Sequence, residues 1–156
     1  MRPIRLRYHL AIAAITGAAI GAAAQAGESM HENTRAGLDK LGHEMSTCAA
    51  YFSLLSSIVE KADGPAERIE TARRIKSTGQ AMLVQSINVA GHIGMGDQVV
   101  MDRVQAAMTE MVRSINDDPP NSLTMMYTKY GVPCDELLQR APKRFADLVQ
   151  SERDDF

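Results

Sequence analysis

Methionine and histidine are the residues of this chain whose types could hold a metal ion. The sequence has ten methionines and four histidines. Thioether and imidazole side chains are ligands that suit copper(I). His92 and Met95 lie three residues apart in a segment that Gly91, Gly94 and Gly96 predict to be a turn. These two residues are the candidate site for copper or another small ligand.

Catalytic patterns are absent from the sequence. It contains no G-x-S-x-G nucleophile elbow and no glycine-rich phosphate loop ending in Gly-Lys-Ser/Thr. His31 and His43 are twelve residues apart, more than three helical turns, so one helix cannot bring both to one zinc ion. We therefore expect a protein that is not an enzyme and that needs no cofactor.

The two cysteines, Cys48 and Cys134, allow a single pairing. An even cysteine count in an exported protein predicts a disulfide, and no C-x-x-C motif favours reactive thiols. The bond would close a loop of 86 residues. Loop entropy for that length is worth about 4–5 kcal/mol, so the disulfide is expected to be a major source of stability.

The first 26 residues have the pattern of a signal peptide. Three arginines within the first seven residues precede the uncharged run Leu10–Ala24, and Ala24-Gln25-Ala26 is a cleavage signal. The run of about 15 residues is shorter than the roughly 20 that span a bilayer, although an uncleaved anchor is the alternative. The sequence thus predicts a signal peptide at 1–26, cleavage before Gly27 and one domain at 27–156. Its expected location is periplasmic or secreted.

Charge excludes one class of partner and argues against another. Cleavage would remove three arginines, leaving 14 basic against 19 acidic residues and a formal charge of −5. No basic block is present, so a nucleic-acid partner is not expected. A membrane-surface helix is not expected either, because such helices are usually basic on their polar face, and no stable membrane insertion is expected after cleavage.

Helical periodicity runs through the rest of the chain. Apolar residues recur at steps of three and four, as on one face of a helix. Glycine and proline mark the ends. The predicted helices are 29–63, from 65 to the glycines at 91–96, 97–116, a short one at 121–131, and 133–151. Pro142 should kink or split the last of these.

The predicted fold is all-α, an antiparallel bundle of four main helices with a short extra helix and one disulfide. The core-facing seams contain small residues at Gly79 and Ser86, which predict a close approach to a neighbour. Five methionines are placed on these seams, where methionine fills irregular gaps; they are Met45, Met82, Met101, Met108 and Met111.

The short helix before Cys134 is the candidate partner-binding element. It carries Met125, Met126, Tyr127 and Tyr130, residue types that are common in protein interfaces. The resulting hypothesis is an exported protein that binds a partner protein without catalysis, as an inhibitor, an immunity-like protein or a chaperone. The alternative is a periplasmic copper or small-ligand binder that uses methionine and histidine.

Overall fold

The computed structural model describes residues 30–61 and 66–154. Within these ranges the chain forms helices and no strand. The helices are α1 (Glu32–Lys61), α2 (Ala66–His92), α3 (Asp97–Asp117), α4 (Ser122–Met126), the π-helix η1 (Tyr127–Gly131) and α5 (Val132–Asp154). The expected all-α class is confirmed for this part of the chain. The predicted signal peptide, its cleavage site and the stop at residues 63–65 lie outside the described residues.

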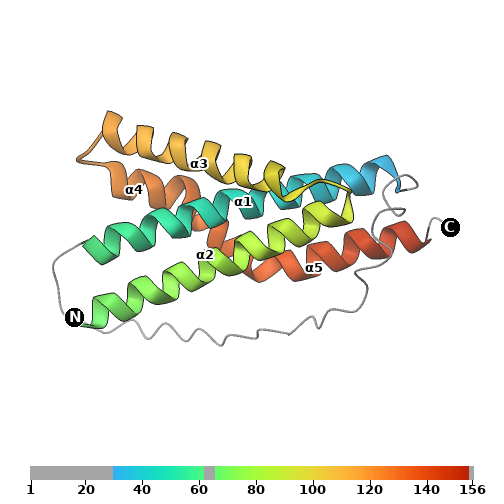
Figure 1. Ribbon diagram of the computed structural model, residues 1–156, viewed down its shortest axis with the longest axis horizontal. Helices are drawn as coiled ribbons and strands as arrows, with labels where there is room; N and C mark the ends of the chain where they lie inside the picture. Colours follow the sequence, from blue (N-terminus) through green and yellow to red (C-terminus); the bar gives the residue numbers. More distant parts are fainter. Residues whose placement is uncertain (1–29, 62–65, 155–156) are drawn as a thin grey trace.

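Helix α1 is central to the packing of the other helices. It contacts α2, α3 and α5, whereas α5 contacts only α1 and η1 among the described elements by backbone proximity. Figure 1 shows that α1, α2, α3 and α5 follow the long axis of the molecule, each running opposite to the long helix before it in the chain. Helix α1 takes this central position because apolar residues recur along it at helical spacing, and neighbouring helices cover them.

The predicted seam of α1 forms the middle of the core. Leu38, Leu41, Met45, Cys48 and Phe52 are all buried, while Leu55 and Val59 at the end of the seam are only half-buried. Burying side chains of this size contributes about 1.5–3 kcal/mol each relative to exposure. The repeat of apolar residues therefore predicted the inner face of α1 correctly up to its last two turns.

Helices α1 and α2 approach closely at small residues, as the sequence predicts. A Cβ atom built on Gly79 would lie 3.1 Å from Phe52 Cβ and 3.3 Å from the Ala49 carbonyl oxygen. Two turns further along α2, the buried Ser86 hydroxyl donates to the Gly42 carbonyl oxygen at 2.8 Å and lies 2.7 Å from Ser46 Oγ. Both hydroxyls are thus satisfied inside the interface, which removes the cost of burying them.

The seam of α3 begins one residue earlier than the sequence predicts. Val100 is fully buried and Met101 is exposed, so the placement of Met101 in the core is wrong. Both residues can precede Val104 in a helical stripe, by four or by three positions, and periodicity does not choose between them. The remaining seam holds, because Met111 is buried and Val104, Met108 and Ile115 pack against the core.

The chain is helical without a break from Ser122 to Asp154, which corrects two predicted boundaries. Gly131 does not end a helix, and Pro133 does not begin a separate one. The amide of Val132 donates to the Tyr127 carbonyl oxygen five residues earlier, the π-helical pattern. Proline has no N–H and crowds the carbonyl four residues before it, so a wider turn accommodates Pro133. The run changes direction here, between α4 and α5 (Figure 1).

Two further predicted breaks have different outcomes. Helix α5 continues through Pro142, so the helix is not split there. The glycine-rich turn between α2 and α3 is present, and Gly94 has a φ of 72°, a left-handed conformation that favours glycine. The chain reverses at this point, as the glycines predict.

Candidate binding surfaces

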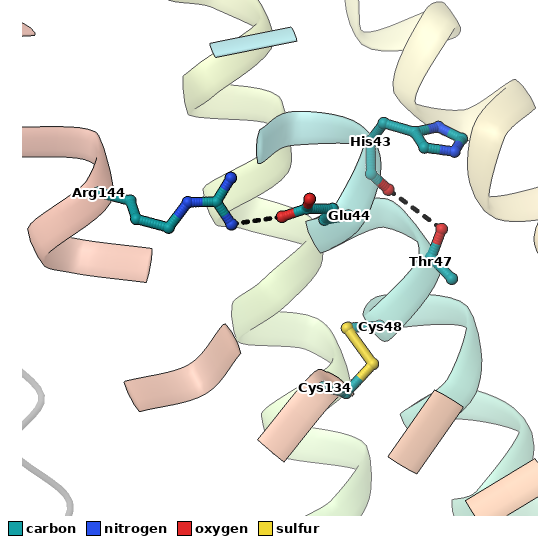
Figure 2. Close-up of a disulfide and its surroundings, with 6 residues drawn as sticks. All are labelled: His43, Glu44, Thr47, Cys48, Cys134 and Arg144. Atoms are coloured by element: carbon teal, nitrogen blue, oxygen red, sulfur yellow. Dashed lines mark hydrogen bonds and ion pairs between the residues drawn. A yellow bond between two sulfur atoms is a disulfide. The ribbon is translucent and has the colours of Figure 1, made fainter. Parts of the chain in front are cut away.

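The disulfide joins the middle of α1 to the first turn of α5. Cys48 and Cys134 are bonded, with their Cα atoms 5.4 Å apart, and both are buried. This is the pairing that the sequence predicts. Figure 2 shows Glu44 and Arg144 facing each other beside the bond, and the Thr47 hydroxyl donating to the His43 carbonyl oxygen. The disulfide therefore holds the beginning of α5 against α1, and the ion pair holds the middle of α5 against the same helix.

The four residues of the predicted partner surface do not lie together. Met126 is 3% exposed and Tyr130 is 7% exposed, and both belong to the core. Met125 and Tyr127 are 39% and 55% exposed. The prediction is therefore wrong for Met126 and Tyr130, which are four residues apart and share the inward face of the helical run. Only Met125 and Tyr127 remain accessible to a partner.

Tyr130 instead connects η1 to α3. Its hydroxyl donates to Glu110 Oε1 at 3.0 Å, and the Lys129 ammonium donates to the same oxygen at 2.7 Å. The Lys129 ammonium also lies 5.1 Å from the centre of the Tyr130 ring. The hydrogen bonds from Lys129 and Tyr130 lower the pKa of Glu110, and the bond to Glu110 raises the pKa of Lys129. These contacts orient the π-helix against α3.

An exposed apolar stripe, consisting of Leu123, Tyr127 and Val132, follows the outer side of this helical run. Leu123 and Tyr127 are four residues apart, and the amide of Val132 bonds to the carbonyl of Tyr127. Each member therefore lies about one turn from the next. All three are exposed, as is the neighbouring Met125. The stripe contains one of the residues that the sequence singled out and adds two that it did not.

His92 and Met95 each contact another helix. The exposed His92 ring stacks on Phe145 of α5, with centroids 5.1 Å apart and planes 9° apart. The half-buried Met95 sulfur is 3.8 Å from Arg103 Nη2, a weak hydrogen bond, and Arg103 also bonds Asp39 at 2.6 Å. No group of three or more His, Cys, Asp or Glu side chains suited to a metal ion occurs in the described ranges. No contact of His92 or Met95 favours the ligand-binding alternative.

A groove between α1 and α5, here called the α1–α5 groove, is the feature that sequence reasoning missed. It measures about 530 Å³ and continues into a second hollow of about 310 Å³. Lys40 and Arg144 line both parts. The disulfide, Pro133 and Leu137 contribute to the apolar lining of the larger part. On α5 the sequence shows only that basic residues recur at helical spacing. It does not show the groove, because the opposite wall comes from α1, far away in the sequence.

Basic side chains are the most numerous charged groups in the larger part of the groove. Four basic residues line it, Lys40, Lys129, Arg140 and Arg144, against two acidic ones, Glu44 and Glu136. Arg144 pairs with Glu44, and Arg140 lies 3.6 Å from Glu136. Lys129 pairs with Glu110, which lies outside the groove lining. Lys40 forms no ion pair with any residue of the described ranges. The second part adds Asp147, so the whole groove has four basic against three acidic lining residues, and Lys40 is the basic one without an ion pair among the described residues.

No known family model matches the chain, and no significant similarity links it to a curated protein or to a solved structure. Across residues 30–61 and 66–154, none of the helices combines the length and the hydropathy needed to cross a bilayer.

Proposed function

We propose that this chain is exported, loses residues 1–26, and acts without catalysis by binding another protein. The mature chain would be a single domain, an antiparallel helical bundle that the disulfide holds rigid. The Cys48–Cys134 bond supports an oxidising compartment such as the periplasm or the exterior. Inhibitor, immunity-like and chaperone roles all use such a preformed helical surface.

The observation that carries this proposal is the exposed apolar stripe. Leu123, Tyr127 and Val132, with Met125 beside them, leave large apolar side chains in water along one helical run. Grouped exposed apolar side chains are typical of protein interaction sites, and tyrosine and methionine are enriched in the centres of interfaces. Burial of the stripe against a partner would be favourable, because it would remove these apolar side chains from water.

Rigidity of the stripe supports the same proposal. Tyr127 lies against Gly131, since a Cβ built there would be 2.6 Å from the Tyr127 ring. Tyr130 and Met126, on the inner side of the run, are fixed in the core. A side chain that is already ordered loses less conformational entropy on binding, which favours affinity.

Site-specific photo-crosslinking tests the surface directly. Benzoylphenylalanine at position 127 should give a discrete crosslinked protein in the periplasm of the native cell, and Leu123→Ser should reduce it several-fold. The matched control is position 84, because Val84 on α2 is 56% exposed and Tyr127 is 55% exposed. Equal crosslinking from both positions, or none from 127, would contradict the proposal. His92→Ala and Met95→Leu are expected to leave the product unchanged.

Native mass spectrometry of the protein purified from the same cells tests export separately. The expected species begins at Gly27 and is lighter by two hydrogens, because one disulfide has formed. A species that retains Met1 would contradict cleavage even if crosslinking from position 127 succeeded.

A further inference from the structure

We propose that the α1–α5 groove binds an acidic segment of a partner protein, at a site separate from the apolar stripe. The proposal rests on three properties of the groove: its length, the charges along it and its apolar lining. It does not depend on the stripe, since Leu123, Tyr127 and Val132 line neither part of the groove.

The length of the groove suits a stretch of polypeptide. Its two parts share Lys40 and Arg144, so together they run from Tyr130 of η1, just before α5, to Leu148 near the end of α5. Eighteen residues of helix extend about 27 Å at 1.5 Å per residue. An extended segment of about eight residues covers the same distance at 3.3 Å per residue. A single small anion would occupy only a fraction of this space.

The charges select an acidic occupant. Lys40 has no ion-pair partner among the described residues and lines both parts of the groove beside Arg144. The Arg144 guanidinium bonds Glu44 through one nitrogen, Nη1, and carries five N–H donors in all. A ligand carboxylate between Lys40 and Arg144 would therefore gain charge-assisted hydrogen bonds without breaking the existing pair. Arg140 offers a second such position one helical turn away.

The acidic residues and the apolar lining favour a peptide over other polyanions. Glu44 and Glu136 in the larger part and Asp147 in the smaller part interrupt the positive surface, and these carboxylates would repel the evenly spaced phosphates of a nucleic acid. Pro133, Leu137 and the disulfide offer apolar contacts between the charged positions. An acidic segment that also carries apolar side chains matches both features, and a flat anionic bilayer does not enter the groove.

Fluorescence anisotropy with labelled peptides tests the proposal on the oxidised mature protein. The probe is an eight-residue peptide of alternating glutamate and leucine, at low salt. We expect binding that weakens as salt is added, because exposed charges are screened. Lys40→Glu should weaken binding at least tenfold. Lys76→Glu on α2 is the matched control, since it makes the same charge change at an exposed position outside the groove. It should change the affinity less than twofold.

Three results would overturn the proposal: no saturable binding of the acidic peptide, an equal loss in Lys40→Glu and Lys76→Glu, or equal binding of a peptide of alternating lysine and leucine. Tighter binding of an oligonucleotide or of anionic phospholipid vesicles, with the same dependence on Lys40, would also overturn it by assigning the groove to another class. Leu123→Ser should leave peptide binding unchanged, so failure here and failure of the apolar stripe can be told apart.

Discussion

Replacing Cys48 and Cys134 together by alanine should destabilise the protein and release α5 before the rest of the fold. The bond closes a loop of 86 residues. In the chain-entropy model, a loop of that length contributes about 4.5 kcal/mol at 25 °C, mainly by restricting the unfolded chain. Two buried sulfur atoms are also lost. A decrease of several kcal/mol in the free energy of unfolding is therefore expected, a large part of the stability of a typical domain.

The release of α5 follows from its few neighbours. By backbone proximity, α5 contacts only α1 and η1 among the described elements. Its side chains also reach the core at Leu137 and Ala141, and its further attachments include the His92–Phe145 ring stack, the Arg144–Glu44 pair and the hydrogen bonds from the His31 amide to the Glu152 carboxylate. Ion pairs as exposed as this one are worth about 1 kcal/mol or less. Without the disulfide, local opening of α5 should therefore cost less than opening of α1.

Two measurements check this prediction. Urea denaturation gives the free energy of unfolding of the oxidised protein and of the double-alanine variant. Hydrogen exchange followed by mass spectrometry then shows where protection is lost, and peptides from residues 136–150 should exchange much faster than those from 38–52. The reduced parent protein is the control and should resemble the variant. A loss below 1 kcal/mol, or an equal loss of protection in both segments, would refute the reasoning.

Four smaller changes follow from the packing and from the burial of Asp135. Ser86→Ala removes the buried contacts of its hydroxyl with the Gly42 carbonyl oxygen and with Ser46 Oγ, and should lower the free energy of unfolding by about 1–2 kcal/mol in urea denaturation; an unchanged free energy would contradict these contacts. Gly131→Ala places a Cβ 2.6 Å from the Tyr127 ring and should destabilise by about 1–3 kcal/mol, whereas Gly91→Ala, with no atom within 4 Å, should stabilise by about 0.5 kcal/mol. If both substitutions changed the free energy of unfolding in the same direction, the crowding at Gly131 would be contradicted. Burial raises the pKa of Asp135, so the folded state binds this proton more tightly than the unfolded state. Its contribution is therefore most favourable at low pH and declines as pH rises through the folded pKa. Asp135→Asn should flatten the pH dependence of the melting temperature just above the ordinary pKa of an aspartate, and an unaltered profile would argue against the assignment.

Sequence alone determined the helical class of the described residues, the helix ends between 92 and 97 and between 117 and 122, and the cysteine pairing. These features depend on short-range causes: apolar residues three and four apart give α1 its inner face, and glycine at 94 permits the left-handed turn after α2. Two cysteines allow one pairing wherever the chain brings them. The expected close approach at Gly79 and Ser86 was also readable, because small side chains on a seam leave room for a neighbour.

The tertiary structure decided which side of each helix is covered and what it meets. The phase of α3 depended on whether Val100 or Met101 reached the core, and Tyr130 turned inward because Glu110 of α3 lay within reach of its hydroxyl. The need for glycine at 131 depended on the Tyr127 ring and the Tyr51 hydroxyl, which leave no space for a Cβ there. The α1–α5 groove has one wall from the first described helix and one from the last, which are far apart in the sequence. A periodic pattern defines a stripe on one helix, but only packing between residues far apart in sequence determines its partner.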